Sequence, residues 1–411
     1  MKQPLSKQPD SAGRYAAVSD SLASLGGSKW AVHAQAHRLE DAGRDVIWLT
    51  IGEPDVPTPP DLVEAAAAAM RAGRTCYSSG AGEPTLRQAL AERYGRSCGR
   101  AFSPSQILCF PGTQTALFAV MATLADESCE VLVGDPMYAT YEGVITAAGA
   151  KMVPVPLSRE RGFRMDAGAL AARITPKSRA VLLNTPHNPT GAVLTAEDIR
   201  EIGRLAVAHD LWLVVDEVYE ELTFEGAQFH SPLFEPWLAD RVVVVSSISK
   251  SHAAPGFRSG WCIGPEELCE RVLPLSEVLL FGNQPFIADM TVQAVSRPSA
   301  VAPGMKRRYK ARALKLAEAA RGSGLLQCHT PDGGMFALVE VSALGMDGES
   351  FAFALLEETG VAVMPGESFG EGLAGWLRIA LTVEDALFEE ACRRLTAFAG
   401  SLAARAAGGA A

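Results

Sequence analysis

Short, continuously apolar runs alternate with amphipathic stretches through the middle of this 411-residue chain. The runs are brief and rich in β-branched residues, which indicates strands covered on both faces. Between several of them apolar residues recur at helical spacing, as at Leu117, Val120, Met121 and Leu124. This alternation predicts an α/β fold with a mostly parallel sheet. The expected strands are 107–110, 130–134, 151–155, 180–184, 212–216, 242–246 and 260–264.

The pattern of apolar and charged residues changes after about residue 298. A long charged helix is expected there, followed by short strands at 334–341, 361–365 and 376–381 and by a last helix, which predicts a smaller α+β domain. Both ends of the chain have compositions typical of frayed termini. The predicted divisions are a disordered N-terminus (1–20), an N-terminal part of the small domain (21–55), a large domain (56–297), the small C-terminal domain (298–400) and a disordered tail (401–411).

Composition and charge exclude several classes of function. A formal net charge of −10 argues against a nucleic-acid or anionic membrane surface, which needs a local excess of Lys and Arg. The eight cysteines are scattered without a CxxC pair, which favours free thiols in a reducing compartment. The sequence contains no apolar run long enough to span a bilayer, no signal-peptide core and no metal-ligand spacing. We therefore expect a cytoplasmic protein.

Polar residues follow the expected strands, where open α/β sheets bind their ligands. A glycine-containing turn at 111–115 opens a helix, and its free N–H groups suit a phosphate. Asp216 ends one expected strand, Lys250 lies in a serine-rich turn after another, and Arg258 follows. A lysine amine, a carboxylate and phosphate-binding groups together suit a phosphorylated heteroaromatic aldehyde: the amine forms the imine and the carboxylate pairs with a protonated ring nitrogen.

Four motifs carry a resemblance to a known family: His187-Asn-Pro-Thr-Gly, Val215-Asp-Glu-Val-Tyr, Ser247-Ile-Ser-Lys and Gly256-Phe-Arg-Ser-Gly. In this order and spacing the chain resembles the class I/II aminotransferases, which are fold-type I pyridoxal-phosphate enzymes of the aspartate aminotransferase kind, over about 21–399. The resemblance implies a large cofactor-binding domain with a seven-stranded sheet, a small α+β domain, pyridoxal 5′-phosphate as cofactor, and a homodimer with shared active sites.

The resemblance assigns the catalytic roles to three residues. Lys250 is implied to be the Schiff-base lysine and to move the proton between substrate and cofactor, whereas a lone lysine is usually a solvated surface ammonium. Asp216 is implied to pair with the pyridine nitrogen; helix capping after a strand is the structural alternative. Tyr219 and Asn188 are implied to bind the phenolic oxygen of the ring, although Asn-Pro-Thr-Gly is also good turn chemistry.

Further residues are implied to bind the phosphate and the ring. Tyr138 takes the place of an aromatic that stacks on the ring, where Trp is frequent in the family, and core packing is the alternative. Tyr77 matches a tyrosine that reaches the phosphate of the neighbouring subunit, or it is simply a loop aromatic. The phosphate cup is implied to consist of Gly112, Thr113, Gln114, Ser247, Ser249 and Arg258.

Arg378 resembles the arginine that holds the substrate α-carboxylate, since a planar fork suits a carboxylate. Gly52 matches a glycine whose backbone lies against the substrate, and Asn188 is expected to contact the substrate as well. A turn is the alternative for Gly52. The helix after the phosphate turn lacks the lysine of one aspartate-specific subgroup; Lys29 is another basic residue that could bind a distal carboxylate.

The implied reaction is ping-pong transfer of an amino group from an L-amino acid to a 2-oxo acid. A carbon–sulfur β-lyase or another elimination uses the same lysine, aspartate and arginine and stays open as an alternative. A non-catalytic regulator that senses the cofactor is disfavoured by the acidic charge and the short polar segment before the enzyme-like region. We expect neutral or aromatic amino donors and 2-oxoglutarate as the acceptor.

Overall fold

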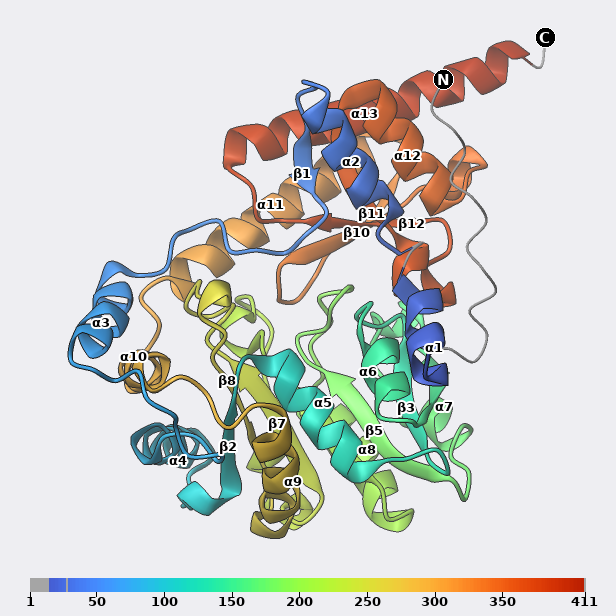
Figure 1. Ribbon diagram of the computed structural model, residues 1–411. Helices are drawn as coiled ribbons and strands as arrows, with labels where there is room; N and C mark the ends of the chain where they lie inside the picture. Colours follow the sequence, from blue (N-terminus) through green and yellow to red (C-terminus); the bar gives the residue numbers. More distant parts are fainter. Residues whose placement is uncertain (1–14, 27–28, 410–411) are drawn as a thin grey trace.

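A seven-stranded sheet forms the centre of the larger of two bodies in the computed structural model (Figure 1). The model describes residues 15–26 and 29–409. One strand, β8, is antiparallel to both of its neighbours, and the other pairs are parallel. The expected α/β fold is confirmed. In sheet order the strands are β2 (Ile107–Phe110), β8 (Gly260–Ile263), β7 (Val242–Ser247), β6 (Trp212–Asp216), β5 (Ser178–Asn184), β3 (Glu130–Asp135) and β4 (Lys151–Pro156).

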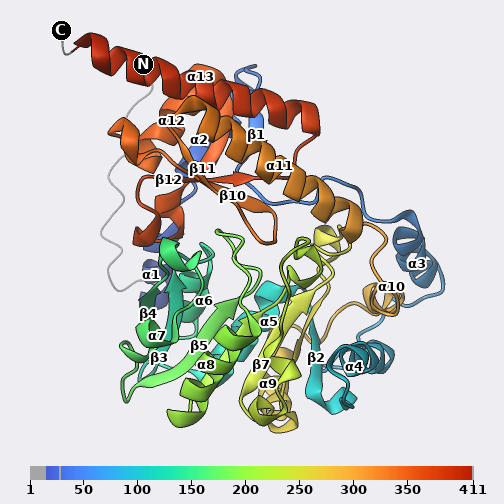
Figure 2. The ribbon, with the colours of Figure 1, turned by 180° about the vertical axis from the view of Figure 1, so that it is seen from behind.

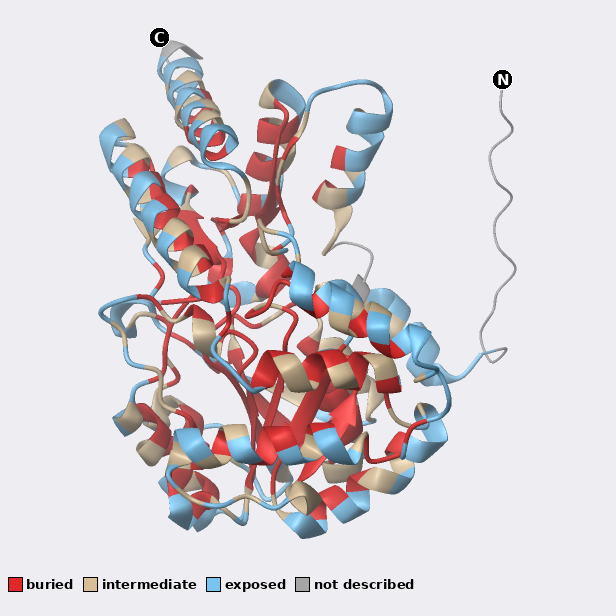
Figure 3. Cartoon of the chain, turned by 90° about the vertical axis from the view of Figure 1, so that its left-hand side faces the viewer, coloured by how far each residue is buried: buried red, intermediate tan, exposed pale blue. Residues whose placement is uncertain are grey.

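Helices cover both faces of this sheet, as the uninterrupted apolar strands predict. In β7, Val242 and Val244 belong to one apolar cluster, whereas Val243 and Val245 belong to the other. Figure 2 shows the strands of the sheet between helices, and Figure 3 shows that these strands and the inner sides of the helices are buried. The apolar cluster on one face includes α4 (Pro84–Cys98), α7 (Ala167–Ala171) and α8 (Ala196–Ala208), and it extends to α10 (Pro285–Val295), which packs on α4, and to α3 (Pro60–Arg71), which packs on α10. The cluster on the other face includes α5 (Thr113–Leu124), α6 (Tyr141–Ala147) and α9 (Glu266–Leu279).

A five-stranded sheet forms the second body, with its own apolar cluster. The edge strands β1 and β9 have three residues each and were not predicted, because such short strands show no periodicity. In sheet order the strands are β1 (Ile47–Leu49), β11 (Val361–Pro365), β12 (Trp376–Ala380), β10 (Phe336–Glu340) and β9 (Gln327–His329); the helices are α2 (Ala31–Asp41), α11 (Ala302–Ser323), α12 (Gly348–Thr359) and α13 (Asp385–Gly409).

The chain ends differ from the prediction. The expected tail 401–411 is wrong as far as residue 409, because α13 continues to Gly409, where alanine-rich sequence favours helix and Arg405 pairs with Glu358 of α12. Helix α1 (Ala17–Gly26) begins inside the expected disordered segment 1–20 and packs against α6. Residues 1–14 and 410–411 lie outside the described residues. The domain limits stay a prediction.

Among the described residues, no helix is both long enough and apolar enough to cross a membrane.

A buried ion cluster fixes the segment that leads from β1 to α3. The Asp55 carboxylate accepts two hydrogen bonds from Arg308, at 2.8 and 2.9 Å, and one from Arg312 at 2.8 Å. The hydroxyl of Tyr309 donates to it at 3.0 Å. All three donors lie on α11, so this helix anchors the loop that contains Gly52.

Candidate active site

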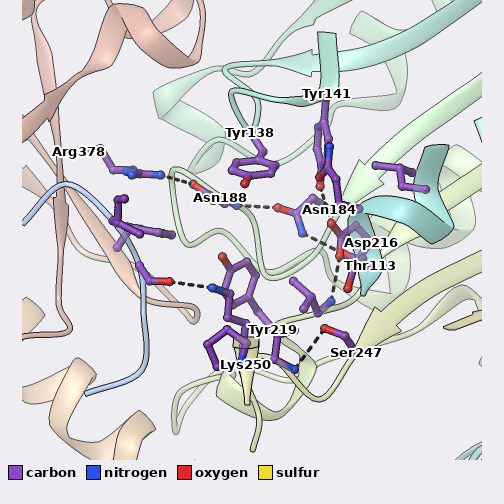
Figure 4. Close-up of a pocket in the computed structure, with 18 of the residues that line it drawn as sticks. Thr113, Tyr138, Tyr141, Asn184, Asn188, Asp216, Tyr219, Ser247, Lys250 and Arg378 are labelled. Carbon is purple, nitrogen blue, oxygen red and sulfur yellow. Dashed lines mark hydrogen bonds between the residues drawn. The ribbon is translucent and has the colours of Figure 1, made fainter. Parts of the chain in front are cut away.

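The carboxyl ends of β5, β6 and β7 meet at one cavity, where the second body covers the edge of the large sheet (Figures 1 and 4). Most of the predicted site residues line this cavity, and Gly112 adjoins it beside Thr113. Tyr77 does not line it and is 87% exposed. The predicted residues in the lining are Gly52, Thr113, Gln114, Tyr138, Asn188, Asp216, Tyr219, Ser247, Ser249, Lys250, Arg258 and Arg378.

Lys250 presents its amine at the floor of the cavity. Its Nζ donates to the carbonyl oxygen of Gly52 at 2.7 Å. Burial lowers the pKa of Lys250 to about 8, assisted by the charges of Arg378 and Arg258 and opposed by those of Glu53 and Asp216. Because a neutral amine is a nucleophile and an ammonium is not, this lysine suits covalent attachment of an aldehyde.

Asp216 ends β6 and is almost fully buried. Burial raises the pKa of its carboxyl to about 6, whereas hydrogen bonds from the Val218 N–H (3.1 Å) and the Tyr141 hydroxyl (2.9 Å) act in the opposite direction. The Val218 bond closes a local turn and is not a helix cap, because the next helix, Glu220–Leu222, has Tyr219 at its N-cap position. At neutral pH Asp216 is therefore mostly an anion, which suits a protonated ring nitrogen.

Arg378 lies in the middle of β12 with its guanidinium between two aromatic rings. The guanidinium carbon is 3.9 Å from the ring centroid of Phe336 and 4.3 Å from that of Phe369. The Arg378 Nη1 donates to Asn188 Oδ1 at 3.0 Å, and Nη2 donates to the Thr50 carbonyl oxygen.

No carboxylate in the described part of the chain forms an ion pair with Arg378, and its buried Nε has no partner. Burial lowers the pKa of Arg378 to about 10. A buried charge without a counter-ion is costly, so this arrangement favours a carboxylate supplied by a ligand.

The turn before α5 fits a phosphate. Gly112 has φ +90°, and a Cβ there would overlap the guanidinium of Arg258. The buried hydroxyl of Thr113, at the first position of α5, has no partner among the described residues. Ser247 Oγ faces Ser249, whose N–H donates to it at 3.3 Å. An unsatisfied hydroxyl, a helix N-terminus and an arginine at one place suit an anion.

Several residues at the cavity were missed by sequence reasoning. Tyr141 donates to Asp216, and Asn184 links two motifs, since its Nδ2 donates to the Asp216 carbonyl oxygen and its Oδ1 accepts from Asn188 N–H (Figure 4). Asn184 could have been found as the last residue of an expected strand. No sequence pattern indicates that Phe336 and Phe369 lie beside Arg378, because only tertiary packing brings these rings to it.

The hypothesis that Lys29 binds a distal carboxylate loses support. Its ammonium pairs with Glu142 at 2.8 Å and does not line the cavity. Trp30, the next residue, lines the cavity together with Ile51. The side-chain end of the cavity therefore presents aromatic and aliphatic surface.

Replacing Gly52 with alanine is expected to weaken substrate binding about tenfold. The new Cβ would overlap the ring of Phe336, which supports Arg378, and overpacking of this kind costs about 1–3 kcal/mol. The KM for the amino donor should rise more than kcat falls. Gly322→Ala in α11 is the matched control, because no atom lies near the added Cβ there and the backbone is helical. An unchanged KM in Gly52→Ala would contradict this prediction, because Phe336 would then have moved aside without weakening substrate binding.

Comparisons with known proteins agree with this geometry. The sequence matches the family Aminotransferase class I and II over residues 44–395. The chain is 40% identical to the arginine–pyruvate transaminase of Pseudomonas aeruginosa over 389 residues, which cover 95% of this chain and 99% of that protein. It is 34% identical to an aspartate aminotransferase of Streptomyces avermitilis, with 89% and 92% coverage.

Solved structures give the same result. A mutant aspartate aminotransferase of Thermus thermophilus superposes with a TM-score of 0.84 at 33% identity, over 90% of this chain and 96% of that one. An aspartate aminotransferase of Rhizobium meliloti superposes with a TM-score of 0.89 at 29% identity, over 94% and 98%. Family, relatives and fold agree, and the chain belongs to the class I and II aminotransferases and is an aminotransferase.

Proposed function

We propose that this aminotransferase binds pyridoxal 5′-phosphate covalently through Lys250 and moves amino groups from L-amino acids to 2-oxo acids. The observation that carries the proposal is the convergence of a buried amine, a buried carboxylate and a buried unpaired arginine on one cavity: Lys250, Asp216 and Arg378. Thr113, Ser247, Ser249 and Arg258 would hold the phosphate, and Tyr138 would face the ring.

Each residue has a defined task. Arg378 binds the α-carboxylate of the substrate and so directs the Cα–H bond toward Lys250. The Lys250 amine, free again when the substrate amine has taken its place, would accept the proton from the substrate Cα and deliver it to the carbon that had carried the aldehyde. Asp216 holds the ring-nitrogen proton in place. The bound cofactor supplies the electron sink that makes the Cα proton acidic and carries the amino group between half-reactions.

Trapping and stoichiometry test this proposal together. Borohydride reduction of protein incubated with pyridoxal 5′-phosphate should give an adduct on Lys250. In a separate, unreduced sample, an amino acid added alone should convert one equivalent of cofactor and stop. Continued release of pyruvate and ammonia would instead identify the β-lyase. The absence of any adduct on Lys250 would overturn the cofactor assignment.

Attachment of the cofactor should depend on pH through the amine. Since burial lowers the pKa of Lys250 to about 8, the reactive neutral fraction rises about tenfold per pH unit below 8 and levels off above it. The rate of adduct formation on apo-protein should follow this profile, whereas the rate for free N-acetyl-lysine should keep rising up to about pH 10.5, the ordinary lysine value. A midpoint near 10.5, the ordinary value for lysine, would contradict the buried environment.

For the substrate, we propose amino donors without a distal carboxylate, and neutral or aromatic side chains in particular. The cations in the described lining are Lys250, Arg258 and Arg378, which have other tasks, and Trp30, Ile51 and Tyr138 offer apolar surface. A panel of half-reactions followed by absorbance tests this. Because the Pseudomonas relative is named for arginine and pyruvate, the panel should include both, with 2-oxoglutarate as the other acceptor. Exclusive use of aspartate would refute it.

We also propose a cytoplasmic homodimer in which Tyr77 reaches the phosphate of the partner's site. Tyr77 is largely exposed and packs edge-on against Phe281, beside the exposed Val278. Exposed aromatic and aliphatic side chains of this kind favour an interface. Sedimentation should give a dimer, and Tyr77→Phe should keep the dimer but bind the cofactor about tenfold more weakly, the loss of one hydrogen bond to a charged group. A monomer with full cofactor affinity would contradict this.

A further inference from the structure

We propose that Tyr141 is a positioning residue that keeps Asp216 ionised and thereby keeps the proton on the nitrogen of the bound cofactor. This inference rests on the proposed function, since it presumes that Asp216 faces the ring nitrogen. Tyr141 is the first residue of α6 and is 2% exposed, and its hydroxyl donates to Asp216 Oδ2 at 2.9 Å (Figure 4).

The hydrogen bonds of Asp216 leave room for a ligand. A carboxylate offers about four acceptor positions. The Val218 N–H takes one on Oδ1 and the Tyr141 hydroxyl takes one on Oδ2. Among the described residues, Tyr141 is the one side chain that donates to this carboxylate. The two bonds fix the carboxylate plane while lone pairs stay free for a donor in the cavity.

The Tyr141 hydroxyl can act only as a donor here. Burial raises its pKa far above the ordinary value, and the charge of Asp216 adds to this effect. The ring lies edge-on to Tyr138, with centroids 5.4 Å apart, and packs in the apolar cluster between α6 and the sheet. The hydroxyl is therefore held in one direction, toward Asp216.

Other ionisable groups near Asp216 do not replace this bond. Lys250 favours the ionised carboxylate, but its nitrogen would become part of the bound cofactor, so it would no longer act as a free side chain. Glu217 is fully buried, burial raises its pKa well above the ordinary value, and its side chain donates no hydrogen bond to Asp216. Burial likewise raises the pKa of Tyr219, which is neutral. In the loaded enzyme the Tyr141 hydroxyl is thus the remaining protein side chain that stabilises the anion.

Loss of the Tyr141 hydroxyl should raise the pKa of Asp216. A hydrogen bond to the charged form lowers the pKa of a carboxyl group, so Tyr141→Phe makes Asp216 more basic by about one to two pH units. The proton shared by Asp216 and the ring nitrogen then moves toward the carboxylate. The acid limit of cofactor binding moves up by the same amount, because binding needs the anion.

The experiment loads full-length protein with cofactor labelled with ¹⁵N at the ring and records the ¹⁵N shift and the cofactor dissociation constant from pH 5 to 9. In Tyr141→Phe the nitrogen signal should move toward its unprotonated value, and the acid limb of binding should move up by about one unit or more. Tyr94→Phe is the matched control: its buried hydroxyl accepts a hydrogen bond from Trp261 instead, and it should behave as wild type.

The outcomes separate the two proposals. If wild type loads on Lys250 and Tyr141→Phe shows the wild-type shift and pH profile, the role of Tyr141 is refuted while the proposed function stands. If wild type itself takes up no cofactor, the proposed function fails. Should Tyr141→Phe not fold, 3-fluorotyrosine at position 141 decides: as a stronger donor it should move the acid limb downward, and an unmoved limb would refute the role.

Discussion

Replacing Lys250 with alanine is expected to lower turnover by at least about 10⁴-fold, the upper range for removal of a positioned acid–base group. Under the proposed function, the variant lacks both the amine that would attach the cofactor and the base that would take the Cα proton. Because Lys250 makes one hydrogen bond, to Gly52, and is otherwise held by burial, the fold should persist. Steady-state transamination and the melting temperature check the two expectations.

Further measurements on Lys250→Ala can test whether the loss of turnover comes from the missing amine. Lys250→Ala should still bind the cofactor noncovalently, since the phosphate and ring contacts come from other residues. A small primary amine such as ethylamine should restore part of the rate by acting as a free base in the vacated space. Lys310→Ala, which removes a partly exposed lysine of α11 that lies outside the cavity lining, is the control. Retention of more than a hundredth of wild-type turnover in Lys250→Ala would refute its role.

Replacing Arg378 with methionine is expected to lower kcat/KM for amino acids by about 10²–10³-fold. Truncating one partner of a buried charge pair costs about 2–5 kcal/mol, and under the proposed function the other partner is the substrate carboxylate. The apolar side chain fits between Phe336 and Phe369, so the strand should stay folded. Arg378→Lys should recover little, because an ammonium cannot form the two parallel bonds of a guanidinium.

An amine without the carboxylate gives the decisive comparison. The decarboxylated analogue of a good donor should react slowly with wild type and about equally slowly with Arg378→Met, since neither protein can use the missing contact. Cofactor loading, measured by absorbance, should be equal in both proteins. If the amino acid and its decarboxylated analogue lose the same factor in Arg378→Met, then Arg378 supports the site generally and does not bind the carboxylate.

The sequence identified the parts of the site that end strands. Each of the seven strands of the large sheet was expected within two residues of its observed limits, because buried parallel strands are uninterrupted apolar runs. Asp216 ends such a run, and Lys250 lies in the turn after the next strand, so the rule that ligands bind at carboxyl ends placed both. Arg378 stood out as a charge within an apolar strand.

Other parts of the site depend on contacts that no local pattern reveals. Tyr141 lies at a helix start and its partner Asp216 is 75 positions away along the chain, so nothing near Tyr141 in sequence indicates the bond. The rings beside Arg378 come from two further segments. The ends were misjudged for a related reason: composition alone suggested fraying, whereas α13 is stabilised by packing and by its ion pair with α12.

The parallel pairing of β1 with β11 sets an order of events during synthesis. Residues 47–49 hydrogen-bond with residues 361–363, close to the opposite end of the polypeptide. When the residues of the seven-stranded sheet have all been synthesised, β11 has not yet been synthesised, so the backbone groups of β1 still lack their strand partner. The carbonyls of Thr50 and Gly52 follow directly, and they meet Arg378 and Lys250 only after the last strands emerge. The nascent enzyme therefore acquires its catalytic centre last.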